Sequence, residues 1–223
     1  MLCKIKKILL LILPVILSAQ DVKIGSWKNY LAYNSASYIA ESKNNIYCIA
    51  NGSLYYLNKG DESINRMSKI NGLSDVDLNK VSYSNKLDLL IITYNNCNID
   101  IVSNNEIINI SDIKRKEVAG LKEINNINLK DSVAYLSTSM GLILVDLEKQ
   151  EIKDTYRIRA SNESVNVNSC CFMGDTIIVA TNNGLFFADK ETSNLSDYNN
   201  WFIFKSSLKV MKLNGILGKY YKN

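Results

Sequence analysis

The chain has 223 residues with one Pro, no His and 13 Tyr, a length that suits a single all-β domain. Without His it lacks the side chain that most often serves as general base or metal ligand, so catalysis and metal binding are less expected. Of its 26 basic residues, three lie among the first seven positions, which leaves 23 bases against 22 acids in a nearly neutral body that does not favour a nucleic-acid partner.

Residues 1–19 predict a signal peptide. Lys4, Lys6 and Lys7 precede an apolar run at residues 8–17, and the small residue Ala19 places cleavage before Gln20. The run is too short to span a bilayer stably, and the mature sequence holds no second one. We therefore expect an exported protein of the periplasm or cell surface, peripheral to the outer membrane, with residues 20–223 forming a partial β-propeller domain.

One short motif recurs along the chain. NGSLYYLN at 51–58 returns as NCNIDIVS at 96–103, MGLILVDL at 140–147 and NGLFFADK at 183–190. The second positions are Gly52, Cys97, Gly141 and Gly184, separated by 45, 44 and 43 residues. A tight turn followed by an apolar or alternating strand, repeated at this period, is typical of the blades of a β-propeller.

The repeat predicts an all-β fold of four-stranded blades. Blade one takes strands at 38–40, 46–50, 53–58 and 64–68, and blade two takes 78–83, 87–94, 98–102 and 106–110. Asn51-Gly52 is a strong hairpin signal, because both central positions of such a turn need positive φ. Cys97 occupies the equivalent glycine position, where a Cβ is strained if φ is positive. Residues 112–123 could hold a helical turn, but we interpret them as an extended connection.

The second half of the chain repeats this plan. Blade three takes strands at 124–129, 133–137, 142–147 and 151–159, and blade four takes 165–173, 176–181, 185–189 and 201–205. The runs 142–145 and 177–180 are apolar on both faces, as suits strands between neighbouring blades. Residues 208–221, with a turn at Asn214-Gly215, predict the start of a fifth blade, so we expect four blades, part of a fifth and an incomplete ring.

The sequence offers little catalytic chemistry. Asp75, Asp77, Asp100 and Asp146 are conceivable as paired acids of a glycoside hydrolase, but we interpret them as ordinary loop and strand residues. Phosphate-loop, dinucleotide and calcium-loop motifs are missing. We therefore predict no enzyme, no cofactor and no catalytic, cofactor-binding or metal residue, and single out only the structural turn positions of the repeat.

The cysteines that follow the predicted signal peptide lack the spacing of a zinc site. We interpret them as small buried residues, although export permits disulfides and a pairing such as Cys48 with Cys97 stays open. They are Cys48, Cys97, Cys170 and Cys171. Aromatic residues such as Tyr55, Tyr56, Phe186, Phe187 and Trp201 are interpreted as packing between blades rather than as a sugar platform.

Several long segments carry a family resemblance: GLSDVDLNKVSYSNKLDLLIITYNNCNIDIV at 72–102, WKNYLAY at 27–33, ISDIKRKEVAGLKEIN at 110–125 and EIKDTYRI at 151–158. Together they resemble the N-terminal propeller of PorZ-type components of the type IX secretion system of Bacteroidota, in truncated form. The resemblance implies a non-catalytic scaffold of the cell-surface attachment complex, with a type IX sortase and outer-membrane proteins as partners. It also implies a role in sorting secreted proteins and attaching them to anionic lipopolysaccharide, which is bound through C-terminal regions outside this sequence.

A second function fits the same repeats. Similar propellers form the periplasmic, glycan-sensing region of hybrid two-component regulators. In those proteins a membrane span and a kinase follow the propeller, and this sequence includes neither.

Overall fold

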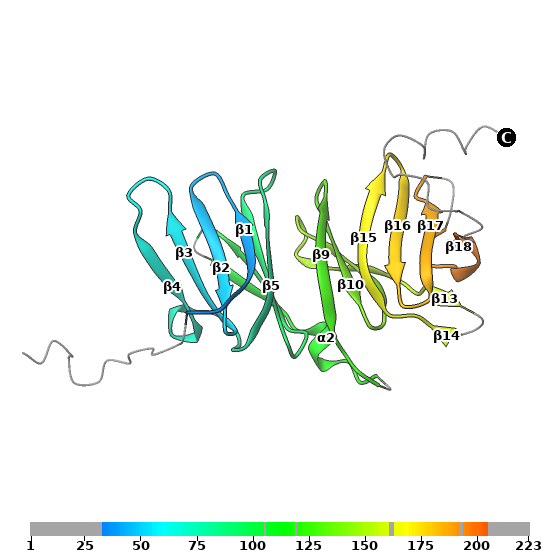
Figure 1. Ribbon diagram of the computed structural model, residues 1–223, viewed down its shortest axis with the longest axis horizontal. Helices are drawn as coiled ribbons and strands as arrows, with labels where there is room; N and C mark the ends of the chain where they lie inside the picture. Colours follow the sequence, from blue (N-terminus) through cyan, green and yellow to red (C-terminus); the bar gives the residue numbers. More distant parts are fainter. Residues whose placement is uncertain (1–32, 105, 119, 161–162, 192–193, 205–223) are drawn as a thin grey trace, which may run out of the picture. The chain divides into compact units, whose positions relative to one another are not determined.

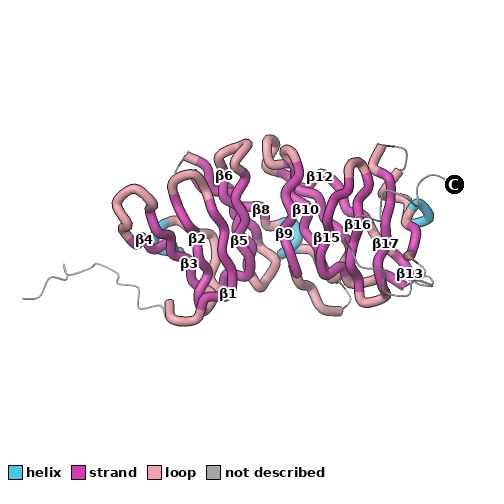
Figure 2. Tube along the Cα trace, turned by 45° about the horizontal axis from the view of Figure 1, so that its top comes forward, coloured by secondary structure: helices cyan, strands magenta, loops and turns pink. Residues whose placement is uncertain are grey.

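The computed structural model describes residues 33–104, 106–118, 120–160, 163–191 and 194–204. These residues form four four-stranded antiparallel sheets, each made from consecutive strands (Figures 1 and 2). The predicted signal peptide and the predicted start of a fifth blade at 208–221 lie outside the described residues.

The strands match the predicted blades closely. Blade one is β1 (Ala36–Glu41), β2 (Asn45–Ala50), β3 (Ser53–Asn58) and β4 (Ile64–Met67), and blade two is β5 (Leu78–Ser84), β6 (Leu89–Tyr94), β7 (Ile99–Ser103) and β8 (Glu106–Ile110). Blade three is β9 (Ile124–Lys130), β10 (Val133–Thr138), β11 (Gly141–Asp146) and β12 (Glu151–Tyr156), and blade four is β15 (Val167–Met173), β16 (Thr176–Thr181), β17 (Gly184–Asp189) and β18 (Phe202–Ile203). Within every sheet the strands pair in chain order, as in a propeller blade.

The first strands of successive blades lie beside one another. Contacts join β1 to β5, β5 to β9 and β9 to β15, so each blade begins next to the start of the blade before it (Figure 1). Such a row of first strands is the hub side of a propeller, with the later strands of each blade farther out.

The apolar core is divided among the three junctions between blades. Ile49, Leu54 and Ile92 are buried between blades one and two. The Ile91, Leu136 and Val145 side chains are buried between blades two and three. The third cluster, between blades three and four, includes Tyr135, Val179, Phe186 and Trp201. Each blade therefore depends on its neighbours for burial of its faces, as in other repeat proteins.

Strands with neighbouring blades on both sides are buried along their whole length. All six residues of β6 and of β10 are buried, and so are Leu142, Ile143, Leu144 and Val145 of β11. In β16 only alternate apolar positions are fully buried: Ile177 and Val179 face blade three, whereas Ile178 is half-buried. The described residues place no blade on the far side of blade four, so one face of this strand keeps contact with solvent.

Two connections differ from the prediction. The segment 112–123, interpreted as extended, begins with a helical turn, α2 (Asp112–Arg115), whose Ile113 side chain is buried in the core between blades two and three. The predicted outer strand 151–159 ends earlier, at Tyr156, and β13 (Arg159–Ala160) pairs with β14 (Glu163–Ser164) in a separate two-stranded hairpin. The helical turn α2 differs from the prediction because the Ile113 side chain packs into the core. The outer strand ends early because residues 159–160 pair with β14 instead of continuing β12.

Short 3-10 turns occur in two other connections, at η2 (Lys69–Asn71) and η3 (Tyr198–Asn200). The cysteines are free thiols in the structure: Cys48, Cys97 and Cys170 are buried and Cys171 is exposed. Cys170 and Cys171 thus point to opposite faces of β15, as adjacent residues of a strand must. Burial among apolar groups raises the pKa of Cys170 to about 12, so this thiol stays protonated near neutral pH.

Candidate functional site

The four repeat positions lie in the turns between the second and third strands of the blades. Gly52, Cys97, Gly141 and Gly184 have φ of 69°, 64°, 121° and 117°. In blade one Asn51 also has positive φ, at 48°, which is the type I′ hairpin that Asn-Gly favours. All four positions thus place the backbone in a region that glycine adopts most readily.

Cys97 is the exception in residue type, and its surroundings explain it. The Cys97 amide donates to the Tyr94 carbonyl at 2.9 Å, closing a longer turn whose last residue takes the left-handed conformation. The Cys97 side chain is fully buried, and its Sγ contacts the Lys122 carbonyl oxygen at 3.3 Å. A glycine would leave this part of the junction between blades two and three unfilled, so burial of the thiol compensates for the strain of the backbone.

Threonine supports the turns of blades three and four. The hydroxyl groups of Thr138 and Thr181 each donate to the carbonyl of the glycine three residues later, Gly141 and Gly184, at 2.8 Å. Both hydroxyl groups also accept from a backbone amide within the turn. The sequence analysis missed this pairing, although the Thr-x-x-Gly spacing in two of the four repeats was a signal for it.

The connections between blades run beside these turns. The Leu78 amide donates to the Gly52 carbonyl at 2.9 Å, and the Asn95 amide donates to the Asp77 carbonyl at 3.0 Å. We call this side of the blades the turn face: the four turns at Gly52, Cys97, Gly141 and Gly184, with the described residues of the connections 68–77, 111–123 and 157–166. A partner that contacts several blades at once would bind these loops together.

Asp75 of the turn face joins two connections. Its Oδ2 accepts from the Lys114 Nζ and from the Asn96 Nδ2, both at 2.6 Å. Partial burial tends to raise the pKa of Asp75, but the hydrogen bonds from Lys114 and Asn96 outweigh it and lower the pKa to about 2. Asp75 is therefore an ionised anchor that holds the connection from blade one against the connection that follows blade two.

Asp100 is fully buried and has a hydrogen-bond partner for each carboxylate oxygen. Its Oδ2 accepts from the Ser74 backbone amide at 2.8 Å and from the Tyr94 hydroxyl at 2.6 Å, and its Oδ1 accepts from the Asn109 side-chain Nδ2 at 2.8 Å. Burial first, and then the bond to Asp100, raises the pKa of Tyr94. These hydrogen bonds hold the connection 68–77 against the third strand of blade two. Asp100 therefore has a structural role as a buried acid whose oxygens are all hydrogen-bonded.

The other two candidate acids are also engaged in local structure. The Asp146 carboxylate accepts from the amides of Glu148 and Lys149, and the Lys149 hydrogen bond is the main reason that its pKa is lowered. Asp77 has φ of 61° and lies against Gly52. The structure thus places Asp75, Asp77 and Asp100 near the junction of blades one and two, and Asp146 at the far end of a blade-three strand.

Asparagine amides bridge the hub from blade to blade. Asn79 donates to the Ile124 carbonyl and Asn125 donates to the Val167 carbonyl, both at 2.7 Å. Each donor is the second residue of a first strand, and each acceptor is the first residue of the next blade's first strand. The sequence analysis missed this bridge, although the signal was present as an Asn at the same place in three repeats.

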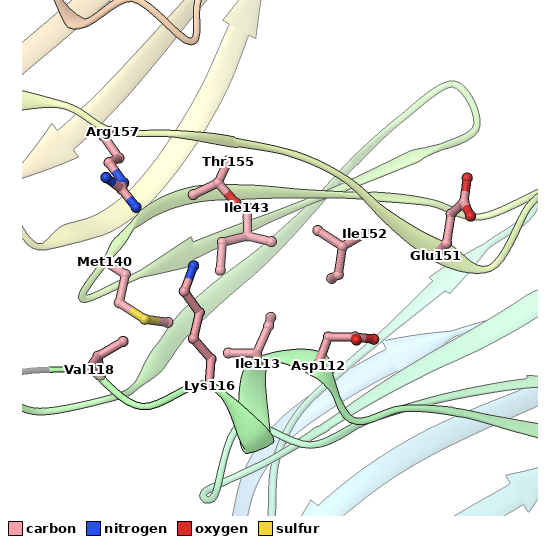
Figure 3. Close-up of a pocket in the computed structure, with 10 residues that line it drawn as sticks. All are labelled: Asp112, Ile113, Lys116, Val118, Met140, Ile143, Glu151, Ile152, Thr155 and Arg157. Atoms are coloured by element: carbon pink, nitrogen blue, oxygen red, sulfur yellow. The ribbon is translucent and has the colours of Figure 1, made fainter.

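A cavity of about 360 Å³ lies between α2 and the outer strands of blade three (Figure 3). Its floor is apolar and its rim is charged; the lining is Asp112, Ile113, Lys116, Val118, Met140, Ile143, Glu151, Ile152, Thr155 and Arg157. Figure 3 shows Arg157 and Glu151 at opposite ends of the cavity. An apolar floor between separated charges suits the side chain of a bound peptide better than it suits a reacting centre.

A second, more polar hollow of about 710 Å³ lies between blades one and two. A row of three tyrosines borders it: the Tyr47 ring lies 5.6 Å from the Tyr56 ring and 5.9 Å from the Tyr83 ring. Because Tyr47 and Tyr83 stack on each other, the row packs the junction between blades one and two, as the sequence analysis expected of Tyr56.

Among the residues that the structure describes, no three His, Cys, Asp or Glu side chains gather as metal ligands. In the same residues no helix is both long enough and apolar enough to cross a membrane.

Consecutive four-stranded blades with neighbouring first strands define the chain as a β-propeller protein. It belongs to the family described as the N-terminal β-propeller domain of PorZ of the type IX secretion system, which matches residues 46–202. Among curated proteins, no sequence matches the chain.

Several solved structures share the fold. PorZ of Porphyromonas gingivalis, described as an essential bacterial surface component of the type IX secretion system, is 26% identical with a TM-score of 0.71, over 81% of this chain and 24% of PorZ. The extracellular domain of BT4673 from B. thetaiotaomicron is 17% identical with a TM-score of 0.59, over 78% of this chain and 24% of that chain. AztD from Citrobacter koseri is 14% identical with a TM-score of 0.53, over 76% of this chain and 48% of that chain. The last two likenesses show the fold alone, and this chain spans about a quarter of the length of PorZ.

Proposed function

We propose that this chain is a non-catalytic scaffold of the type IX secretion system, acting in the cell-surface attachment complex that contains the sortase. The observation that carries the proposal is the family match over residues 46–202, supported by the likeness to PorZ over 81% of the chain. The role in that complex is to assist the sorting of secreted proteins and their attachment to anionic lipopolysaccharide.

The geometry of the turn face supports a binding role. Asp75 and Asp100 hold connections between blades in place, and their hydrogen bonds leave them little freedom to act as acid or base. The loops of the turn face and the cavity beside α2 instead offer a broad, rigidly held surface of the kind that proteins recognise.

The proposal includes location and partners. An exported chain, released from a signal peptide at residues 1–19, would lie in the periplasm or at the cell surface, peripheral to the outer membrane. Its partners would be the type IX sortase and outer-membrane proteins of the attachment complex. Because the chain covers only 24% of PorZ, contact with lipopolysaccharide is assigned to C-terminal regions outside this sequence.

Co-purification tests the proposal. An affinity-tagged chain is expressed in a bacterium with a type IX system, and the sortase is measured in the eluate. Recovery of sortase above that found with an unrelated exported propeller would support the scaffold role. If the sortase binds a full-length PorZ in parallel but never this chain, the chain lacks the proposed function.

Variants at the cavity test, in the same co-purification experiment, whether the sortase binds there. Arg157→Glu reverses the charge at one end of the cavity. Lys153→Glu is the control, because it reverses an exposed charge on the preceding strand, β12, that does not line the cavity. A loss of sortase with Arg157→Glu alone would place the contact at the cavity, and an equal effect of both variants would place it elsewhere on the surface.

The sensor function is the second candidate considered from the sequence. The likeness to the BT4673 extracellular domain, at 17% identity, shows the fold and does not favour that function. Reading the encoding gene beyond Asn223 separates the two: further blades and a terminal β domain would support the secretion role, and a membrane helix followed by a kinase would contradict it.

A further inference from the structure

The cavity beside α2 lies at a place where each junction between blades brings two segments together. These segments are the connection that follows one blade and the outer strand of the next blade. By strand register, one residue of each outer strand holds the same position: Ile107 lies opposite Val102 in blade two, Ile152 lies opposite Val145 in blade three, and Trp201 lies opposite Ala188 in blade four.

The other two junctions are filled at this position. Between blades one and two the connection passes directly over the outer strand, because an added Cβ at Gly72 would lie 3.3 Å from the Ile107 Cδ1. Between blades three and four the Trp201 indole fills the space, since it is buried with Ile158 of the connection and donates its Nε1 hydrogen to the Leu195 carbonyl at 3.0 Å.

The junction between blades two and three is open at the same position. Ile152 is smaller than the tryptophan of blade four and only half-buried, and a cavity of about 360 Å³ lies over it. Ile113 and Ile143 form the rest of the cavity's buried floor, and each is 4% exposed. This junction therefore has room for a large apolar group from outside the chain.

The charged side chains of the rim form a basic end and an acidic end. Arg157 and Glu151 lie at opposite ends of the cavity (Figure 3). In the same view Lys116 lies toward Arg157, whereas Asp112 lies toward Glu151. Of the three ion pairs between described residues, one joins Asp112 to Arg115 at 3.2 Å, and none includes Lys116, Glu151 or Arg157. A ligand with charges of the opposite order would complement both ends.

The distance between the two ends sets the size of such a ligand. Glu151 is the first residue of β12 (Glu151–Tyr156) and Arg157 follows the last, so six steps of about 3.3 Å place their backbones up to about 20 Å apart. A free amino acid or a single sugar is too short to reach both ends. An extended peptide of about six residues has the required length.

We propose that this cavity binds an extended segment of a partner protein, with an acidic side chain at one end, a basic side chain at the other and a large apolar side chain between them. The acidic side chain pairs with Arg157 and Lys116, and the basic side chain pairs with Glu151. The apolar side chain fills the cavity over Ile152. The choice of a protein as occupant rests on the proposed scaffold function, whereas the chemistry of the segment rests on the cavity itself.

A peptide selection tests the proposal. A phage library of random octapeptides is selected on the purified chain and counter-selected on Ile152→Trp, which places at this position the indole that blade four has. We expect the enriched peptides to share an acidic, a large apolar and a basic residue, in this order or its reverse, within about six positions. A selection that enriches no peptide, or enriches peptides without both charges, would overturn the proposal.

Charge reversals at the two ends measure how the segment lies. Fluorescence anisotropy of a labelled, enriched peptide gives its dissociation constant. Arg157→Glu and Glu151→Lys should each raise this constant about tenfold, because an attraction becomes a repulsion at an exposed site. Lys153→Glu and Glu148→Lys are the matched controls, at exposed residues that do not line the cavity, and should leave the constant unchanged. Equal effects of variants and controls would show that only net charge matters and would contradict the proposal.

An exchange of charge between protein and peptide identifies the basic end. The peptide whose acidic residue is replaced by lysine should bind Arg157→Glu more tightly than it binds the wild type. An unchanged preference for the wild type would mean that the acidic residue does not lie at Arg157. Both charge variants replace exposed side chains, so this readout does not depend on the folding of Ile152→Trp, and circular dichroism confirms the fold of each variant.

The sortase co-purification, run in parallel, distinguishes failure of this proposal from failure of the scaffold function. Recovery of sortase by a chain that binds no peptide would overturn the peptide site alone. Peptide binding with the expected dependence on Arg157 and Glu151, without recovery of sortase, would overturn the scaffold function and support the peptide site.

Discussion

Gly141 of the turn face stands directly against the outer strand of its own blade. A Cβ added there would collide with the carbonyl oxygen of Tyr156, and φ is already 121°. Gly174, with φ of 57°, also lies in the left-handed region, but an added Cβ would meet no atom within 4 Å. The two glycines thus separate the cost of backbone strain from the cost of a steric clash.

Gly141→Ala is expected to lower the free energy of unfolding by about 3 kcal/mol or more, because strain and overpacking add. Gly174→Ala should lower it by about 1 kcal/mol, from strain alone. Urea denaturation measures both values. Equal losses at the two positions would mean that the backbone at Gly141 moves away from Tyr156 without cost.

Asp75 should give the stability of the protein a pH dependence in acid. Since its pKa is lowered to about 2 in the folded chain, the unfolded chain takes up the proton first as pH falls. The stabilisation from Asp75 is complete above about pH 4, the usual range of an aspartate. This stabilisation is then lost as pH falls towards 2. Because solvent screens the Asp75 carboxylate, its contribution to the free energy of unfolding is about 1 kcal/mol or less.

Unfolding free energies of the wild type and Asp75→Asn, measured by denaturant between pH 5 and pH 2, check this expectation. The wild type should lose its advantage over Asp75→Asn within that interval. Asp77→Asn is the matched control, since Asn tolerates the left-handed φ of 61° at this position, and should keep the pH profile of the wild type. A constant difference between wild type and Asp75→Asn would show that Lys114 and Asn96 do not stabilise the ionised carboxylate.

The helical turn α2 contributes to the core through one side chain. Ile113 is 4% exposed and packs with residues of blades two and three. Ile113→Ala should therefore lower the free energy of unfolding by about 3 kcal/mol. Leu121→Ala, in the same connection but 77% exposed, should change it by less than about 0.5 kcal/mol. Similar effects of the two variants in thermal or urea unfolding would mean that α2 is not part of the junction.

The asparagine side-chain amides at the hub stabilise the junctions between blades. The Asn125 Nδ2 donates to the Val167 carbonyl and to the Asn166 side chain, both at 2.7 Å. Asn125→Ala leaves both acceptors without this donor and should cost about 1 to 2 kcal/mol. Asn65 is the control, because its side-chain amide donates to the Ser63 hydroxyl of its own blade. Asn65→Ala is expected to cost less than about 0.5 kcal/mol in the same denaturation experiment. A loss at Asn65 as large as that at Asn125 would contradict a special role for the hub bridge.

The repeat pattern of the sequence was sufficient to predict the blades. Turn residues such as Asn51-Gly52 and runs such as 142–145 report local conformation and burial on both faces, and both depend on residues close together in the chain. The hub bridge from Asn125 to Val167, the cavity beside α2 and the burial of Ile113 were not predicted, because each joins segments whose proximity arises only when blades pack together.

The sequence by itself therefore determined the four-stranded unit, its period and the places where the chain turns, since hydrogen bonding within a blade follows from strand and turn propensity. Only the tertiary structure decided what each acid and amide does. The Asp75 carboxylate became an anchor between two connections, because packing between repeats sets the surroundings of every side chain at a junction.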